Sequence, residues 1–164
     1  MSIFCLFLLL FVVHDIEEIV VQHRWMLAHR ETLARRFPRF QPAVRQLLRL
    51  NTRAFAVAAL EEWLVLWLAV GYVWLDGPYA TQIASALFMA YAVHLLVHVL
   101  QALAWRGYVP GLLTALLQLP LAAFALCSLW SGSTAGEILL WSLAAVAFVV
   151  ANLRFAHWLG MKCK

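Results

Sequence analysis

The feature that most constrains the fold is a set of five long apolar runs. Each has about 20 residues, the length with which an α-helix crosses a hydrocarbon core of about 30 Å. Charged residues make up 12% of the 164 residues, whereas soluble domains contain about 25%. We therefore predict an all-α integral membrane bundle with a single domain, residues 1–164. Its five transmembrane helices are expected at 2–22, 54–75, 79–104, 112–131 and 136–159.

The expected spans end at residues that break helices. The segments "LDGPY" at 75–79, "WRGYVPG" at 105–111 and "SGSTAG" at 131–136 are rich in glycine, proline and serine. The first run has no basic start and no cleavage site of small residues. We therefore expect a retained transmembrane helix there rather than a cleaved signal.

Between the first two spans, residues 23–53 form a strongly basic segment. It carries eight arginines and one acid, Glu31, with aromatic and aliphatic residues between them. Pro38 and Pro42 favour two short amphipathic helices lying along the membrane surface, with a solvated charged hairpin as the alternative. Because such an excess of arginine is typical of cytoplasmic loops, we expect no nucleic-acid partner.

The remaining basic residues fit one orientation of the chain. If 23–53 is cytoplasmic, alternation of the spans brings Arg106, Arg154, Lys162 and Lys164 to the same side. The sequence thus predicts a multi-pass protein of the cell membrane, with its N-terminus outside and its C-terminus in the cytoplasm.

Every expected span carries polar residues, all within about 5–15 Å of the cytoplasmic boundary at 1.5 Å per residue. A charged group in such a position is costly unless it is compensated. The common depth predicts one buried site. Its members are His14, Glu17, Glu18, Glu61, Glu62, His94, His98, Gln101, Gln118, Asn152 and His157.

Compensation by metal ions explains this layer best. His14 and Glu18 are four residues apart, as are His94 and His98, so each pair shares a helix face. No lysine or arginine lies deep in a span, and Cys5, Cys127 and Cys163 are too scattered for a thiolate site. Imidazole and carboxylate ligands suit iron, zinc or manganese. We predict two divalent ions, with iron favoured, on His14, Glu17, Glu18, Glu61, His94, His98 and His157.

Other residues are expected to assist this site. Gln101, Asn152 and Tyr108 would orient the ligands, while Glu18 and Glu62 are the candidate catalytic bases. Asp15 points away from the His14 face. Each polar group alone also has a simpler interpretation, as a hydrogen-bonded histidine pair or a protonated glutamate.

Two motifs carry a resemblance to a known family. "HDIEE" at 14–18 has the pattern H-x-x-E-E, and "YVPG" at 108–111 has the pattern Y-x-P-G. The chain resembles the HXXEE family in both motifs, and the additional family histidine corresponds to His94 or His98. The resemblance implies a small multi-spanning membrane protein without an established activity.

The sequence favours a membrane metalloenzyme that opens toward the cytoplasmic leaflet. Its substrate would be apolar or lipid-like, with membrane lipids around it. Iron would bring oxidation or hydroxylation and require an electron donor, whereas zinc would bring hydrolysis. The alternative is a proton-coupled or metal-ion-coupled transporter or channel that uses the same cluster, for which a homodimer could supply a path.

Overall fold

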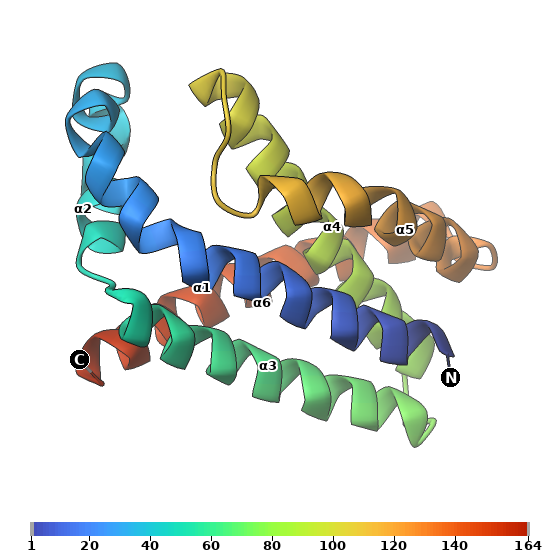
Figure 1. Cartoon of the computed structure of the whole chain (residues 1–164). Helices are drawn as coiled ribbons and strands as arrows, with labels where there is room; N and C mark the ends of the chain where they lie inside the picture. Colours follow the sequence, from blue (N-terminus) through green and yellow to red (C-terminus); the bar gives the residue numbers. More distant parts are fainter. Residues whose placement is uncertain (1, 164) are drawn as a thin grey trace.

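The computed structural model describes residues 2–163, which are helical and contain no strand. The elements are α1 (Ser2–Arg36), the 3₁₀ turn η1 (Pro38–Phe40), α2 (Gln41–Leu48), α3 (Thr52–Trp74), α4 (Ala80–Trp105), α5 (Leu112–Trp130) and α6 (Ala135–Lys162) (Figure 1). The all-helical prediction is confirmed. Lys164, which the orientation argument used, lies outside the described residues.

Within residues 2–163, four helices are long and apolar enough to cross a membrane: α3, α4, α5 and α6. Their ends lie within two residues of the predicted spans 54–75, 79–104 and 112–131, and within three of 136–159. The chain is therefore a membrane protein by the length and composition of these helices. α1 is not among the four, because its apolar half carries Asp15, Glu17 and Glu18. A fifth span in α1 stays a prediction.

The start of the basic segment differs from the sequence prediction. We expected a first span ending near residue 22, followed by two short separate helices. Instead α1 runs without a break for 35 residues, because no proline or glycine interrupts it before Pro38. The prolines act as predicted from there on, since Pro38 opens η1 and Pro42 lies in the first turn of α2.

The main core is formed where α1, α3, α4 and α5 meet. α1 and α3 lie side by side, with α4, α5 and α6 packed behind them (Figure 1). Phe7 of α1 packs against Phe88 and Tyr91 of α4, with ring centroids 4.6 and 5.1 Å away. Small residues of α5 such as Ala115 and Ala122 complete the core and let the helices approach closely.

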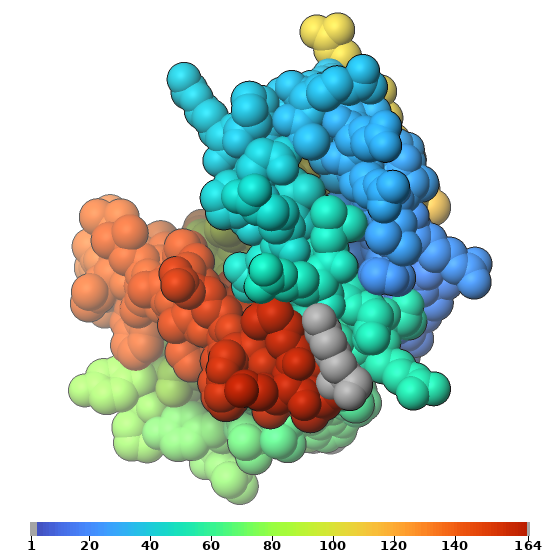
Figure 2. Space-filling view, turned by 90° about the vertical axis from the view of Figure 1, so that its left-hand side faces the viewer, coloured from blue at the N-terminus to red at the C-terminus, as the bar shows by residue number. Residues whose placement is uncertain are grey.

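A second, smaller core lies under the basic segment. Met26 and Leu33 of α1 and Val44 of α2 are buried together, and Trp105 at the end of α4 packs against them. Arg36 donates a hydrogen bond of 2.6 Å to the Trp105 carbonyl oxygen. Residues 25–50 form a lobe above the C-terminal end of α6 (Figure 2). Contact of this lobe with a membrane surface stays a prediction.

We predict that Gly160→Ala destabilises the bundle. A β-carbon at Gly160 would collide with the Ala54 carbonyl oxygen of α3, and such overpacking typically costs about 1–3 kcal/mol. Gly136→Ala is the matched control in the same helix, because nothing lies within 4 Å of the added carbon. Thermal unfolding in detergent should show a lower midpoint for Gly160→Ala alone. Equal midpoints for the two variants would contradict the close α3–α6 contact.

Candidate metal centre

Four potential ligands converge where α1 crosses α4. His14 and Glu18 come from α1, and His94 and His98 come from α4; each residue offers a ligand atom within 4.8 Å of the others. The i, i+4 spacing on both helices places each pair on one face, as the sequence predicts. His14 is fully buried and His98 is 6% exposed. This group could hold a metal ion.

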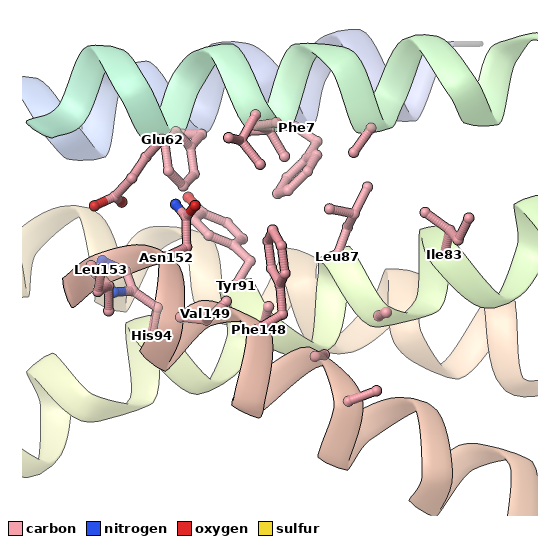
Figure 3. Close-up of a pocket in the computed structure, with 18 of the residues that line it drawn as sticks. Phe7, Glu62, Ile83, Leu87, Tyr91, His94, Phe148, Val149, Asn152 and Leu153 are labelled. Carbon is pink, nitrogen blue, oxygen red and sulfur yellow. The ribbon is translucent and has the colours of Figure 1, made fainter. Parts of the chain in front are cut away.

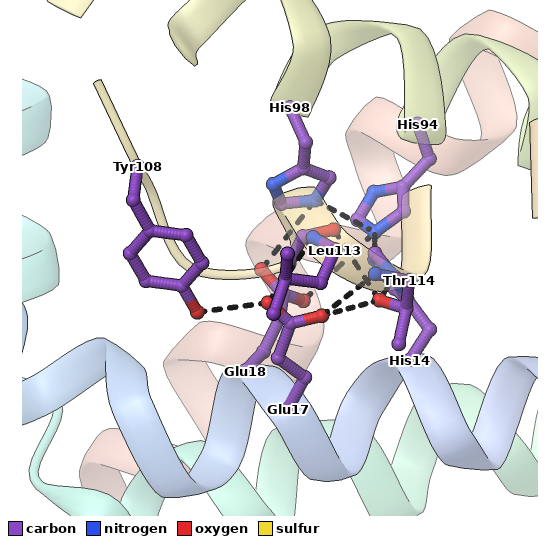
Figure 4. A network of polar contacts seen from close by, with 9 residues as sticks. His14, Glu17, Glu18, His94, His98, Tyr108, Leu113 and Thr114 are labelled. Atoms are coloured by element: carbon purple, nitrogen blue, oxygen red, sulfur yellow. Dashed lines mark hydrogen bonds and ion pairs between the residues drawn. The ribbon is translucent and has the colours of Figure 1, made fainter. Parts of the chain in front are cut away.

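The separations of these atoms are close to those of a coordination shell. His94 Nε2 lies 3.0 Å from His14 Nε2 and 3.2 Å from His98 Nε2. The Glu18 carboxylate lies 3.5 Å from His98 Nε2 and 3.9 Å from His94 Nε2 (Figure 4). Tetrahedral ligands at bond lengths of 2.0–2.1 Å are about 3.3 Å apart. An ion could therefore enter with only small movements of the side chains.

A threonine sets the protonation of the first histidine. The Thr114 hydroxyl donates a hydrogen bond of 2.7 Å to Glu17 Oε2, because an ionised carboxylate can only accept. The same hydroxyl must then accept the 2.7 Å contact from His14 Nδ1. The Nδ1 proton leaves the Nε2 lone pair of His14 free to face His94 and His98. This is how residues around a metal site fix the tautomer of a ligand.

Glu17 joins the two sequence motifs. Its carboxylate accepts hydrogen bonds from the Thr114 backbone N–H at 2.9 Å and the Leu113 N–H at 3.4 Å, in the first turn of α5. A negative charge is favourable there, since free N–H groups and the helix dipole point toward it. Tyr108 Oη also donates to Glu17, at 2.8 Å. Glu17, predicted as a ligand, lies outside the group of four and holds the Tyr108–Gly111 turn against α1.

Desolvation, followed by the hydrogen bond to Glu17, raises the pKa of Tyr108 to about 12. The phenol therefore remains protonated, and remains a donor, across the physiological pH range. The sequence suggested Tyr108 as a residue that orients ligands; in the structure its hydroxyl contacts Glu17.

Gly111 lets the turn approach the histidines. It has a φ of +81°, in the left-handed region that glycine adopts readily. A β-carbon there would lie 2.8 Å from the His98 ring and 3.1 Å from His14. The glycine of Y-x-P-G therefore leaves room for two of the four ligands.

Two cavities adjoin the histidines. The first, of about 360 Å³, is apolar and lies between α1, α3, α4 and α6. Its polar residues Glu62, Tyr91, His94 and Asn152 gather at one end, away from Leu87 and Ile83 (Figure 3). The second, of about 190 Å³, is lined by Asp15, Glu18 and Glu62 together with glutamines and histidines. We call them the apolar cavity and the carboxylate cavity.

The other predicted site residues lie outside the four-ligand group. Glu61 accepts a hydrogen bond of 3.2 Å from Asn152, which ties α3 to α6. His157 and Gln101 line the carboxylate cavity. Gln118 accepts from Tyr91 and donates to the Leu10 carbonyl oxygen at 3.1 Å. The predicted residues share a depth along their helices, and several of them therefore line one cavity. Only four of them belong to the group that could hold a metal ion.

The sequence reasoning missed Thr114, and it gave Asp15 no clear role. Thr114 stands three residues after the Y-x-P-G glycine, in the first turn of a helix, which is a position where a hydroxyl commonly meets an acceptor. Asp15 was expected to point away from His14, and it does reach a different surface, the carboxylate cavity.

Comparison with known proteins places the chain in a family. Residues 5–125 match the family described as "Protein of unknown function with HXXEE motif", so the chain belongs to the HXXEE family. No curated protein and no solved structure matches it. The matched range covers both motifs, residues 14–18 and 108–111, together with His94 and His98.

We predict that Tyr108→Phe lowers the free energy of unfolding by about 1 kcal/mol. Hydrogen bonds to charged groups typically contribute about 1.5–3 kcal/mol. The bond from Tyr108 to Glu17 is expected to contribute less, because the Tyr108 side chain is exposed. Tyr79→Phe is the control, because the exposed Tyr79 hydroxyl has no hydrogen-bond partner among the described residues. Thermal unfolding of both variants in detergent measures the difference. An unchanged midpoint for Tyr108→Phe would contradict the link between the motifs.

Proposed function

We propose that the protein is an integral membrane metalloenzyme that acts on an apolar or lipid-like substrate. The observation that carries the proposal is the convergence of three imidazoles and one carboxylate, whose ligand atoms all lie within 4.8 Å of one another. Among residues 2–163, no lysine or arginine lies within 4.0 Å of a carboxylate oxygen. A buried carboxylate without a cation is costly, and a divalent ion would compensate Glu18.

The ligand set favours one ion per chain at this position. The sequence argument favoured two ions, and the remaining carboxylates nearby are Asp15 and Glu62 in the carboxylate cavity. Three imidazoles and one carboxylate suit iron, zinc or manganese. We propose iron, because the adjoining apolar cavity would present alkyl C–H bonds rather than a hydrolysable polar bond to the ligands.

The proposed reaction is an oxygen-dependent hydroxylation or desaturation. In a hydroxylation, one atom of dioxygen enters a C–H bond and the other leaves as water, with two electrons and two protons from an electron donor. An iron ion would supply the activation of dioxygen. Glu62 lies at the junction of both cavities, where its carboxylate can receive or return a proton.

We further propose that the site faces the cytoplasmic leaflet of the cell membrane. Eight exposed arginines in residues 23–53 support this orientation through the preference of basic residues for the cytoplasmic side. α1 would be the fifth span, with its acids compensated by the metal ion and by the N-terminus of α5. Anionic lipids would gather at the lobe of residues 25–50.

Elemental analysis of protein purified without chelator tests the proposal. We expect about one iron per chain in the wild type and loss of most of it in His98→Ala, since removal of a ligand opens the shell. His29→Ala is the matched control: His29 contacts Trp25 and Trp105, away from the four ligands.

Each other result redirects the interpretation. Zinc in place of iron would replace oxidation by hydrolysis. Two ions per chain would restore the dinuclear prediction. Background metal in the wild type would overturn the metalloenzyme proposal and favour a proton-coupled or metal-ion-coupled transporter, which flux measurements in proteoliposomes would then test.

A second variant tests the hydrogen-bond chain behind His14. Thr114→Val removes the hydroxyl between His14 Nδ1 and Glu17, and loss of such a partner typically weakens metal binding about 10–100-fold. Thr81→Val is the control at an exposed threonine in the first turn of α4. Metal affinity measured by competition with a chelator should fall for Thr114→Val alone. Equal affinities would show that the tautomer of His14 does not depend on Thr114.

A further inference from the structure

The apolar and carboxylate cavities adjoin each other beside the four potential ligands. Glu62, His94 and Leu153 contribute to both. Phe7 and Leu87 lie deep in the apolar cavity, whereas Glu62 and Asn152 mark its polar end (Figure 3). A ligand that fills both cavities must therefore have an apolar body and a polar head. The apolar volume of about 360 Å³ lies within the range of about 300–1,000 Å³ that small-molecule sites occupy.

The carboxylate cavity determines the charge of that head. Asp15, Glu18 and Glu62 line it, and its described lining contains no lysine or arginine. Asp15 is only 9% exposed, and no hydrogen bond joins its carboxylate to another described side chain. A buried polar group normally has a partner, so an unpartnered carboxylate facing a cavity points to a ligand with hydrogen-bond donors.

The composition of the lining leads to the same ligand. Three carboxylates face the cavity, and no lysine or arginine among the described residues lines it. An ammonium group would donate hydrogen bonds to Asp15 and Glu62 and would favour the ionised form of each. A phosphate or carboxylate head would instead be repelled by the same groups.

We propose that the two cavities bind a single-chain aliphatic amine, with its chain in the apolar cavity and its ammonium group in the carboxylate cavity. This inference rests on the proposed function, whose substrate class it names. His94 lines both cavities, so the carbon atoms nearest the ammonium group would lie beside the metal ligands. Oxidation is then expected near the head of the molecule rather than at the far end of its chain.

Equilibrium binding to the detergent-purified protein tests the proposal. Tritiated dodecylamine is the probe, and dodecanol and dodecanoate compete with it, so that only the head differs. We expect the amine to bind at least about tenfold more tightly than the carboxylate, because like charges brought together in a buried site are strongly unfavourable. The alcohol should fall between them. Equal affinities for amine and carboxylate would overturn the proposal without the need for any variant.

Variants assign the binding to the two cavities. Ala90→Phe places a ring in the apolar cavity and should weaken the amine and the alcohol alike. Asp15→Asn should weaken the amine more than the alcohol. Ala123→Phe, at an exposed position on α5, is the control and should bind as the wild type does. Unchanged amine binding in Ala90→Phe would contradict the assignment.

Metal content, measured on every sample, separates the two proposals. Selective amine binding without bound metal would sustain the cavity assignment while the metalloenzyme proposal fails. Bound metal without selective amine binding would have the opposite meaning. A second metal equivalent that is lost in Asp15→Asn would show that the carboxylate cavity holds an ion, and would also overturn the amine proposal.

Discussion

The structure depends on one carboxylate, that of Glu17, which joins α1 to the start of α5. It accepts hydrogen bonds from two backbone N–H groups of α5, from Thr114 Oγ1 and from Tyr108 Oη. A helix N-terminus and a half-buried carboxylate each lack partners when apart, so their contact satisfies both. The Y-x-P-G turn is thereby held where Gly111 contacts His14 and His98.

This arrangement gives the adjacent glutamates of H-x-x-E-E different tasks. Glu17 and Glu18 point about 100° apart around α1. Glu17 therefore reaches α5, while Glu18 reaches the histidines of α4. His14 belongs to both sets, since its Nδ1 contacts Thr114 and its Nε2 faces His94. One helical turn of α1 thus carries potential ligands and the group that orients them (Figure 4).

The four potential ligands lie beside two cavities, and this position supports the proposed oxidation of an apolar substrate. Apolar side chains of four helices line one side and carboxylates line the other. A substrate chain can thus remain in an environment like that of the membrane while its head meets polar groups. His94 lines both cavities, so the proposed substrate would lie beside the potential ligands.

The sequence by itself determined the all-helical membrane fold, the bounds of four helices and the shared helix faces of His14 with Glu18 and of His94 with His98, because hydropathy and i, i+4 spacing are local properties. Tertiary structure alone decided that Glu17 binds α5, that Glu61 pairs with Asn152 and that Thr114 contacts His14. Depth along a helix can be read from the sequence, but the partner across the bundle depends on how the helices rotate and pack. That rotation brings His14, Glu18, His94 and His98 together from a larger set of equally deep polar residues.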